Sequence, residues 1–320
     1  MAVLLFERSN HALDVNPPAG HQHLSVHGSD WLWAVTAVFL LATLVYFALS
    51  FFARSGERIF HYLFTIGLLV GTIAYYAMAA DLAFRVISQS NQTHKGDRQI
   101  FWPKYVYWVV SFPVLILALG LPSGISWTTI FYQITLSWVW VISYLVAAFT
   151  RTNYKWGFFA FGTFAWILLA LSTLRDGFSG ARRVGIGRDI SLLSGWVNFL
   201  WLLYPIAWGV SDGGNRIGVT RSFIFFGILD ILLLPVIAFA VLPMSRRWDY
   251  GRLNLAFTQY GRVNAPQGTF PEKSHPTSSA AGAGTGVGTG AGMGAGAPGT
   301  GVTTAAPATT TGGVAGEPVP

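Results

Sequence analysis

The sequence has no cysteine and very little charge. Without cysteine, no disulfide can stabilise the fold and no thiol can act as a nucleophile. Only 10% of the 320 residues are charged, against roughly 25% in a soluble domain, while 52% are hydrophobic. A globule in water cannot bury so much apolar side chain, so the composition predicts a membrane protein. The net charge of +7 then indicates basic loops beside anionic lipid rather than nucleic-acid binding.

Seven long apolar runs lie between polar or glycine-rich loops. A helix that crosses a bilayer needs about 20 mostly apolar residues. Runs of about that length occupy residues 31–53, 59–80, 102–121, 127–149, 156–174, 190–210 and 222–242. We therefore predict an all-α membrane protein, with a bundle of seven transmembrane helices over residues 31–245.

The segments outside the bundle have a different composition. We expect residues 1–30 to be an irregular extracellular segment and residues 246–266 to be a basic juxtamembrane segment. Residues 267–320 are rich in Gly, Ala, Thr and Pro and have almost no large apolar residue, which predicts a disordered tail. The His-x-His pattern at His21 and His23 is a weak metal signal without an apparent fourth ligand, so we predict no metal site.

An odd number of spans places the two termini on opposite sides of the membrane. Basic residues are almost equally frequent in both sets of loops, but the densest groups lie in residues 174–189 and 245–252. The positive-inside rule then favours an extracellular N-terminus and a cytoplasmic C-terminus. A glycosylation sequon at Asn91, in the loop between the second and third runs, would face outward in this orientation.

One acidic residue lies deep inside a predicted span. Asp230 stands in the sequence GILDILLLPVIAF with no basic residue beside it. A charge at mid-bilayer costs about 2.5–3.5 kcal/mol on insertion scales, so such a residue usually faces the bundle interior and has a partner. Asp230 is therefore either a structural carboxylate or part of a site. Asp81 and Lys104 lie near helix ends, where side chains can reach the lipid headgroups.

Aromatic residues and prolines gather in the third and sixth runs. They are Tyr107, Trp108, Ser111 and Pro113 in the third run, and Trp201, Tyr204, Pro205 and Trp208 in the sixth. Steps of three and four place the residues of each set on one helical face, and each proline kinks its helix. Two such helices predict either a flat aromatic slot across the bundle or tight apolar packing without a ligand.

These motifs resemble the microbial rhodopsins, the seven-helix retinal proteins of the bacteriorhodopsin type. The resemblance covers residues 30–245 and includes the Trp-x-x-Tyr-Pro-x-x-Trp motif of the sixth run and the Leu-Asp pair that ends at Asp230. It implies that Asp230 is the counterpart of a counter-ion. It also implies a retinal-slot-like lining made of Trp108, Ser111, Trp201, Tyr204, Pro205 and Trp208.

The chain departs from that family at the retinal attachment position. The family binds retinal through a Schiff-base lysine four residues after the aspartate, and here that position is Leu234. The whole chain has four lysines, none of them in the sixth or seventh run: Lys95, Lys104, Lys155 and Lys273. Without a buried amine no imine can form. We therefore expect no covalent retinal, while a non-covalent ligand stays open.

Other positions that handle protons in family pumps are also replaced. Tyr107 stands in place of the proton acceptor, Ala118 in place of the proton donor and Lys104 in place of the outer arginine. Our hypothesis for Asp230 is therefore structural. It accepts hydrogen bonds from Tyr107 and Tyr204, or it pairs with Lys104 through water.

A chain that keeps these motifs but lacks the Schiff-base lysine resembles the lysine-less branch of fungal opsin-related proteins. That branch includes a small plasma-membrane heat-shock protein. This resemblance implies a non-photoactive protein of the plasma membrane that acts in stress or pH homeostasis. Such a protein would serve as a membrane chaperone or restrain the proton-pumping ATPase. Membrane lipid and the ATPase are the partners implied, and a homo-oligomer is a further possibility.

Two other functions remain open, and an enzyme is not expected. The chain could be a receptor or carrier that holds retinal or another flat apolar ligand without a covalent bond. An intact aromatic slot would favour this function, and a slot packed shut by Leu234 and Phe112 would not. It could also be a channel or transporter, which would need a chain of polar groups across the bilayer. No set of catalytic or metal-binding residues converges inside the runs, so we predict no enzymatic activity.

Overall fold

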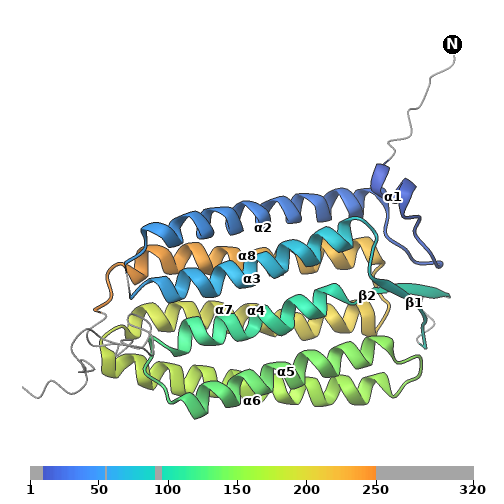
Figure 1. Ribbon diagram of the computed structural model, residues 1–320. Coiled ribbons are helices and arrows are strands. Elements are labelled where there is room, and N and C mark those ends of the chain that lie inside the picture. The colour runs from blue at the N-terminus through green and yellow to red at the C-terminus, as the bar shows by residue number, and fades with distance from the viewer. Residues whose placement is uncertain (1–9, 55, 91–95, 250–320) are drawn as a thin grey trace, which may run out of the picture. The chain divides into compact units, whose positions relative to one another are not determined.

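Seven long helices lie side by side in the computed structural model, which describes residues 10–54, 56–90 and 96–249 (Figure 1). They are α2 (Val26–Phe52), α3 (Arg58–Ala79), α4 (Pro103–Gly120), α5 (Trp127–Phe149), α6 (Lys155–Val184), α7 (Gly187–Trp208) and α8 (Val219–Ser245). All seven are long and apolar enough to cross a membrane. The predicted seven-helix bundle is therefore confirmed, although α6 continues past the predicted end at residue 174 to Val184.

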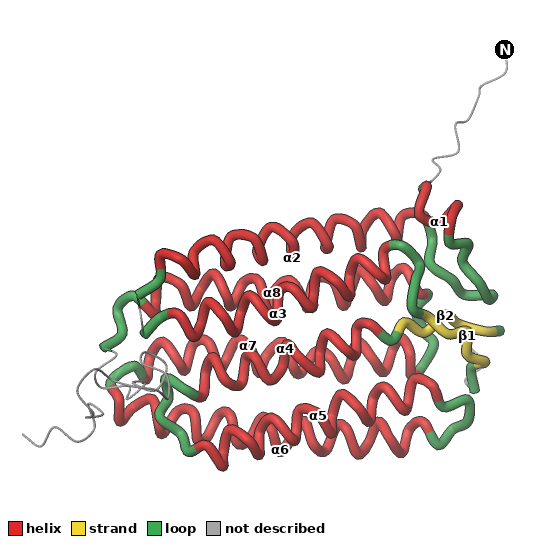
Figure 2. Tube along the Cα trace, in the orientation of Figure 1, coloured by secondary structure: helices red, strands yellow, loops and turns green. Residues whose placement is uncertain are grey.

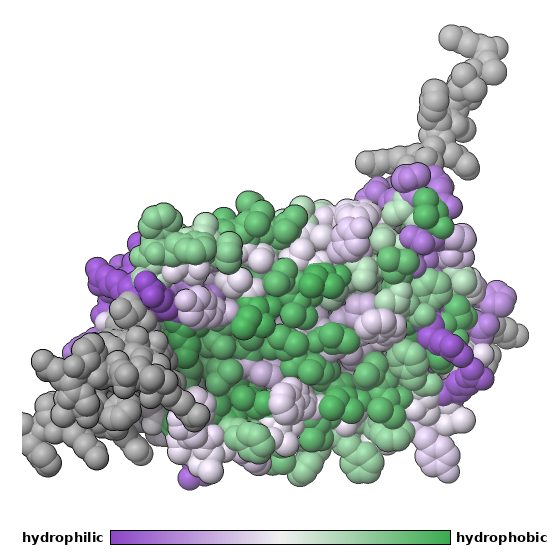
Figure 3. All heavy atoms as spheres, in the orientation of Figure 1, coloured by the Kyte–Doolittle hydropathy of each residue, from purple (hydrophilic) through white to green (hydrophobic). Residues whose placement is uncertain are grey.

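Each helix turns one face to the bundle interior and another to the surroundings. On α2, Leu32, Val35 and Phe39 are buried at steps of three and four, whereas Leu41 and Phe51 are about two-thirds exposed. Figure 3 shows the exposed apolar side chains as a broad band along the middle of the molecule, with polar residues at both ends. Large apolar side chains on the outside are the surface that lipid tails require.

The helices form a closed ring in which α8 returns to pack against α2. Two hydrogen bonds join these helices, from the Tyr46 hydroxyl to the Ala238 carbonyl and from Trp31 Nε1 to the Phe223 carbonyl (3.1 Å). Glycine is needed at position 227, because a Cβ there would lie 2.6 Å from Trp31 Nε1. The first and last spans therefore hold each other closely, and this closes the interior around α4 and α7.

A small polar cap covers the end of the bundle where α2 begins (Figure 2). Between α3 and α4, strands β1 (Phe84–Ser88) and β2 (Asp97–Phe101) form an antiparallel hairpin. Gln22 pairs with β2 in a parallel bridge at Arg98, so the N-terminal segment lies along the hairpin. The hairpin was not predicted, because each strand has only five residues and no clear alternation.

The N-terminal segment is more ordered than the sequence predicted. A short helix, α1 (His11–Val15), is capped by the Asn10 side chain. Helix α2 begins at Val26 rather than near residue 31, because the Ser25 hydroxyl accepts a hydrogen bond from the Gly28 amide. Residues 91–95, with the sequon, and 250–320, with most of the predicted juxtamembrane segment and all of the predicted tail, lie outside the described residues.

Asp81 is buried where α3 meets the cap. Both of its carboxylate oxygens accept from Gln99 Nε2, at 3.3 and 3.2 Å. Burial raises the pKa of Asp81 from 3.8 to about 6, while the bond from Gln99 opposes the shift. The expectation that Asp81 reaches the headgroup region is therefore wrong, since the side chain is only 2% exposed.

We predict that Asp81→Asn raises the melting temperature near neutral pH and flattens its dependence on pH. Because the folded protein holds this proton more tightly than the unfolded chain, the stabilisation is complete below about pH 4 and is lost as pH rises through about 6. Asparagine also tolerates the positive φ of 53° at this position. Thermal unfolding in detergent at several pH values measures the effect, with exposed Asp14→Asn as the control. A variant as pH-dependent as the wild type would contradict the prediction.

Candidate functional site

Asp230 is a fully buried carboxylate in the middle of α8. Its Oδ1 accepts hydrogen bonds from the Tyr204 hydroxyl of α7 at 2.5 Å and from Trp108 Nε1 of α4 at 3.1 Å. Its Oδ2 accepts a hydrogen bond from the Tyr75 hydroxyl of α3. A single carboxylate therefore joins α8 to three other helices, and we call these four side chains the Asp230 clamp.

The clamp differs from our hypothesis in two of its members. Tyr107 does not donate to Asp230, and its buried hydroxyl has no hydrogen-bond partner in the described part of the chain. Tyr75 takes the place that we expected for Tyr107. The sequence does not show which of the adjacent residues Tyr75 and Tyr76 faces inward; in the structure Tyr75 is buried and Tyr76 is 54% exposed.

Lys104 belongs to a second buried network, centred on Asp212. Its Nζ donates to Asp212 Oδ2, which also accepts from the Tyr105 hydroxyl at 2.8 Å. Arg98 Nε lies 3.5 Å from Asp212 Oδ1. The expectation that Lys104 reaches the headgroups is therefore wrong, because its amine is buried, and its direct partner is Asp212 rather than Asp230.

A π-helical turn positions Asp212. The turn η1 (Gly209–Gly213) continues α7, and the Gly214 amide donates to the Gly209 carbonyl across it at 2.8 Å. A Cβ at Gly213 would lie 2.3 Å from the Trp208 ring, so this tight turn needs glycine there. We predicted that the sixth span ends at residue 210, so Asp212 was not recognised as an interior residue.

Arg98 ties the cap to the Asp212 network. Its Nη1 donates to the Ile217 carbonyl at 2.6 Å and to Asn215 Oδ1 at 3.2 Å, both in the segment between η1 and α8. Burial lowers the pKa of Arg98, and the charge of Asp212 opposes that shift. Two buried cations, Arg98 and Lys104, thus share the buried carboxylate of Asp212. Separating either cation from Asp212 would leave a buried charge unpaired, which is costly, so the geometry of the network is maintained.

The predicted aromatic slot is filled by a side chain of the protein itself. Trp108, Trp201 and Tyr204 are buried, as the slot prediction requires. The ring of Phe112, however, stacks on Trp108 with centroids 6.3 Å apart and lies 5.4 Å from both Trp201 and Tyr204. The fourth aromatic residue, Trp208, packs elsewhere, stacked on Phe159 with centroids 5.1 Å apart. The aromatic residues therefore form a packed interior around Phe112.

The remaining predicted site residues are also buried in this interior. Ser111 and Ala118 on α4, Pro205 on α7 and Leu234 on α8 all face the bundle core. Leu234 lies one turn after Asp230, and its Cδ2 would be 3.1 Å from a Cβ built on Gly67. The position of the family's lysine is thus occupied by a packed isobutyl group.

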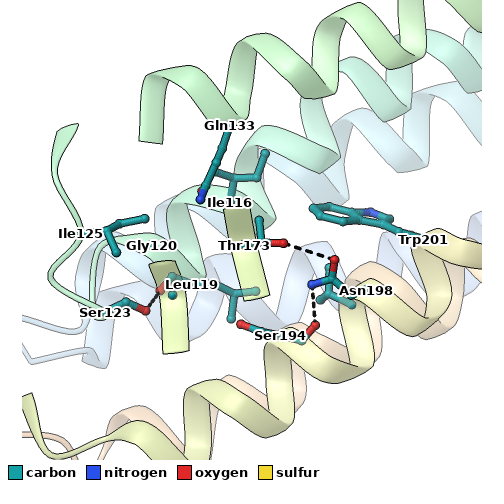
Figure 4. Close-up of a pocket in the computed structure, with 12 residues that line it drawn as sticks. Ile116, Leu119, Gly120, Ser123, Ile125, Gln133, Thr173, Ser194, Asn198 and Trp201 are labelled. Carbon is teal, nitrogen blue, oxygen red and sulfur yellow. Dashed lines mark hydrogen bonds between the residues drawn. The ribbon is translucent and has the colours of Figure 1, made fainter. Parts of the chain in front are cut away.

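A small cavity lies next to Trp201, between α4, α5, α6 and α7 (Figure 4). Its volume of about 20 Å³ suffices for roughly one water molecule, far below the roughly 300–1,000 Å³ of ligand pockets. Thr173 donates to Asn198 Oδ1 at 3.2 Å, and Asn198 Nδ2 donates to the Ser194 carbonyl at 2.8 Å. This cavity has no room for a ring system. Among the described residues, no group of three metal-binding side chains comes together.

We predict that Tyr75→Phe destabilises the protein more than Tyr76→Phe. The first variant removes a bond to Asp230, and the second removes an exposed hydroxyl on the next residue. The expected difference is about 0.6 kcal/mol, the average for hydrogen bonds between membrane helices. Unfolding in a denaturing detergent, followed by tryptophan fluorescence, measures both. Equal stabilities of the two variants would show that the clamp contributes nothing.

Comparison with known proteins supports the resemblance. Residues 28–245 match the family described as bacteriorhodopsin-like protein. Protein FDD123 of Trametes versicolor is 40% identical over 78% of this chain and 89% of its own length, and the opsin-like protein carO of Fusarium fujikuroi is 36% identical over 84% and 91%. The 30 kDa heat shock protein of Saccharomyces cerevisiae is 30% identical over 83% and 88%.

Solved structures give the same answer for the fold. The light-driven proton pump LR (Mac) of Leptosphaeria maculans is 28% identical, with a TM-score of 0.66 over 70% of this chain and 96% of the pump. The light-driven proton pump CsR of Coccomyxa subellipsoidea is 25% identical, with the same TM-score over 69% and 97%. The chain therefore belongs to the bacteriorhodopsin-like family, and its relatives include fungal opsin-related proteins.

Proposed function

We propose that this chain is a non-photoactive opsin-related membrane protein that acts through protein partners in stress response or pH homeostasis. The observation that carries the proposal is the buried Leu234, one turn after Asp230, where the family's retinal lysine would stand. The sequence has no lysine anywhere in α7 or α8. No residue of these two helices can therefore form an imine with retinal.

The buried lysine nearest to the clamp is a poor substitute for the missing one. The amine of Lys104 donates to Asp212 and lies 4.8 Å from the centroid of the Phe226 ring. An amine that donates to a carboxylate must break that contact before its nitrogen can attack an aldehyde. These contacts therefore favour a structural role for Lys104 in the Asp212 network.

Phe112 opposes the alternative of a non-covalent retinal carrier. Its ring is 1% exposed and lies among Trp108, Trp201 and Trp140, the last at a centroid distance of 5.0 Å. A flat ligand would have to displace this ring and would lose the packing of four aromatic side chains. The same packing opposes a channel or transporter, which would need a continuous polar path across the membrane.

The stress role rests on the relatives rather than on the site. One relative is named as a heat shock protein, and several others are named as opsins or opsin-like proteins. The proposal accordingly includes a plasma-membrane location, an extracellular N-terminus and a cytoplasmic C-terminus. It also makes the proton-pumping ATPase the first candidate partner, and it assigns the chain no enzymatic activity.

We predict that all-trans retinal added to the purified protein gives no red-shifted absorption band. The chain has no amine on α8 to form a protonated imine, and Phe112 fills the slot. Absorption spectra before and after addition measure this, with a retinal-binding pump of the family as the positive control. A red-shifted band that Lys104→Arg or Lys155→Arg abolishes would overturn the proposal, because it would place a Schiff base on another lysine.

We also predict that cross-linking in native plasma membranes enriches the proton-pumping ATPase with the tagged full-length protein. Enrichment should increase after heat or weak-acid stress, if the chain restrains the pump when ATP must be conserved. An unrelated tagged protein with seven transmembrane helices, expressed at the same level, is the control. Equal recovery of the ATPase with both baits, together with unchanged pump activity in a deletion strain, would contradict the proposed partner.

A further inference from the structure

A second polar site lies at the end of the bundle opposite the cap, where α2 ends, α3 begins and α8 ends (Figure 1). A cavity of about 230 Å³ opens there. Its lining combines apolar, acidic and basic side chains from all three helices and their ends: Leu49, Phe52, Ala53, Arg54, Glu57, His61 and Arg246. None of these residues belongs to the Asp230 clamp or to the Asp212 network.

Glu57 is a buried acidic residue whose side chain has no evident structural role. Its side chain is only 5% exposed, yet its Oε1 is buried without a hydrogen-bond partner among the residues that the structure describes. Glu57 stands at the N-cap position of α3, but it makes no capping bond with its side chain. A buried carboxylate oxygen that is left unpaired costs free energy, so a donor from outside the described chain would stabilise it.

The surroundings of Glu57 favour a cation with N–H groups. His61 Nδ1 donates to the Glu57 carbonyl at 3.0 Å, which leaves Nε2 of the neutral ring as an acceptor. Ala53 and Arg246 are the C-caps of α2 and α8, so two helix C-termini end at the cavity, against the single N-terminus of α3 at Glu57. The negative end of a helix dipole attracts positive charge, as the carboxylate does.

The rim of the cavity carries the opposite charge. Arg54 and Arg246 both line it and are both exposed, and guanidinium groups bind phosphate through paired N–H bonds. Phe52, which is 87% exposed, and Leu49 extend the lining along α2 toward the lipid-facing surface. The cavity thus combines an acidic interior, an arginine rim and an apolar side. A ligand with an ammonium group, a phosphate beside it and an acyl chain would match all three.

We propose that this cavity binds the headgroup of phosphatidylethanolamine. The ammonium group donates to Glu57 and His61, the phosphate accepts from Arg54 and Arg246, and the acyl chains follow Phe52 along α2. The cavity is smaller than the roughly 300–1,000 Å³ of pockets that enclose whole drug-sized ligands, which fits a headgroup whose tails stay in the bilayer. The inference goes beyond the proposed stress function and does not depend on it.

The chemistry of the site distinguishes this lipid from its neighbours in the membrane. The trimethylammonium group of phosphatidylcholine has no N–H, so it would leave the Glu57 oxygen unpaired. Phosphatidylserine adds a carboxylate next to the ammonium group, and this negative charge would lie close to Glu57. The site should therefore prefer ethanolamine to both choline and serine headgroups.

Native mass spectrometry of the full-length protein tests the proposal. Mixed micelles supply equal amounts of phosphatidylethanolamine and phosphatidylcholine, and the ratio of retained lipids is measured. We expect retention to favour ethanolamine on the order of tenfold, as a charge-assisted hydrogen bond predicts. Glu57→Gln should abolish most of this preference, whereas Asp14→Asn, an exposed acid at the opposite end of the bundle, should preserve it.

Arginine variants and methylated lipids test the phosphate and ammonium contacts separately. Arg54→Gln combined with Arg246→Gln should weaken retention of both lipids, because the phosphate loses its partners. A series of mono-, di- and trimethylated ethanolamine lipids, tested on the wild type, should show retention that falls with each methyl group, and it needs no variant to fold. Retention that is indifferent to methylation, or a preference for phosphatidylserine alone, would overturn the proposal.

Discussion

The interior of this protein depends on one carboxylate that accepts hydrogen bonds from three helices. Asp230 stands at the centre of an apolar span, where an unpaired charge would be costly, and the protein surrounds it with two tyrosine hydroxyls and one indole N–H. Each bond joins α8 to a different helix. The register of α3, α4 and α7 around α8 is therefore fixed by donors that must all reach one group.

The Asp212 network completes this arrangement toward the capped end of the bundle. The two networks lie close together, because the ring of Tyr105, whose hydroxyl donates to Asp212, lies 5.0 Å from the Trp108 ring of the clamp. Between Trp108 and Trp201 the space is taken by Phe112. In a retinal protein the chromophore would fill such a slot and its imine would face the aspartate. Here side chains of the protein supply both the volume and the hydrogen bonds.

Both buried carboxylates of the spans and their π-helical extension serve contacts between helices, Asp230 with Tyr75 and Tyr204 and Asp212 with Lys104. The two ends of the bundle differ from this interior and from each other. One end carries the hairpin and the N-terminal segment, and the other carries a cavity lined by Glu57, Arg54 and Arg246.

Much of the fold could be predicted because bilayer-spanning helices need long apolar runs, and those runs are visible in the sequence. The aromatic and proline spacing likewise identified Trp108 and Tyr204 as interior residues, and the depth of Asp230 in an apolar run identified that residue. Tyr75 and Asp212 could not be found in this way. The first looks like any aromatic residue of a span, and the second becomes interior only because a π-helical turn extends α7.

The sequence left the slot either open or packed shut by Leu234 and Phe112. It could not decide between them, because the side chain that fills the slot depends on rotamers and on close packing across four helices. Composition and periodicity therefore specify which helices form, and roughly which face each turns inward. They do not specify which of the inward side chains contact one another.

A double-mutant cycle between Tyr204 and Asp230 tests most directly whether this carboxylate holds the bundle together. The four proteins are the wild type, Tyr204→Phe, Asp230→Leu and the double variant, compared by their free energies of unfolding in the same detergent. The clamp predicts that Tyr204→Phe destabilises the wild type but has little further effect once Asp230 is gone. Additive effects of the two substitutions would contradict it, because the two residues would then stabilise the protein independently.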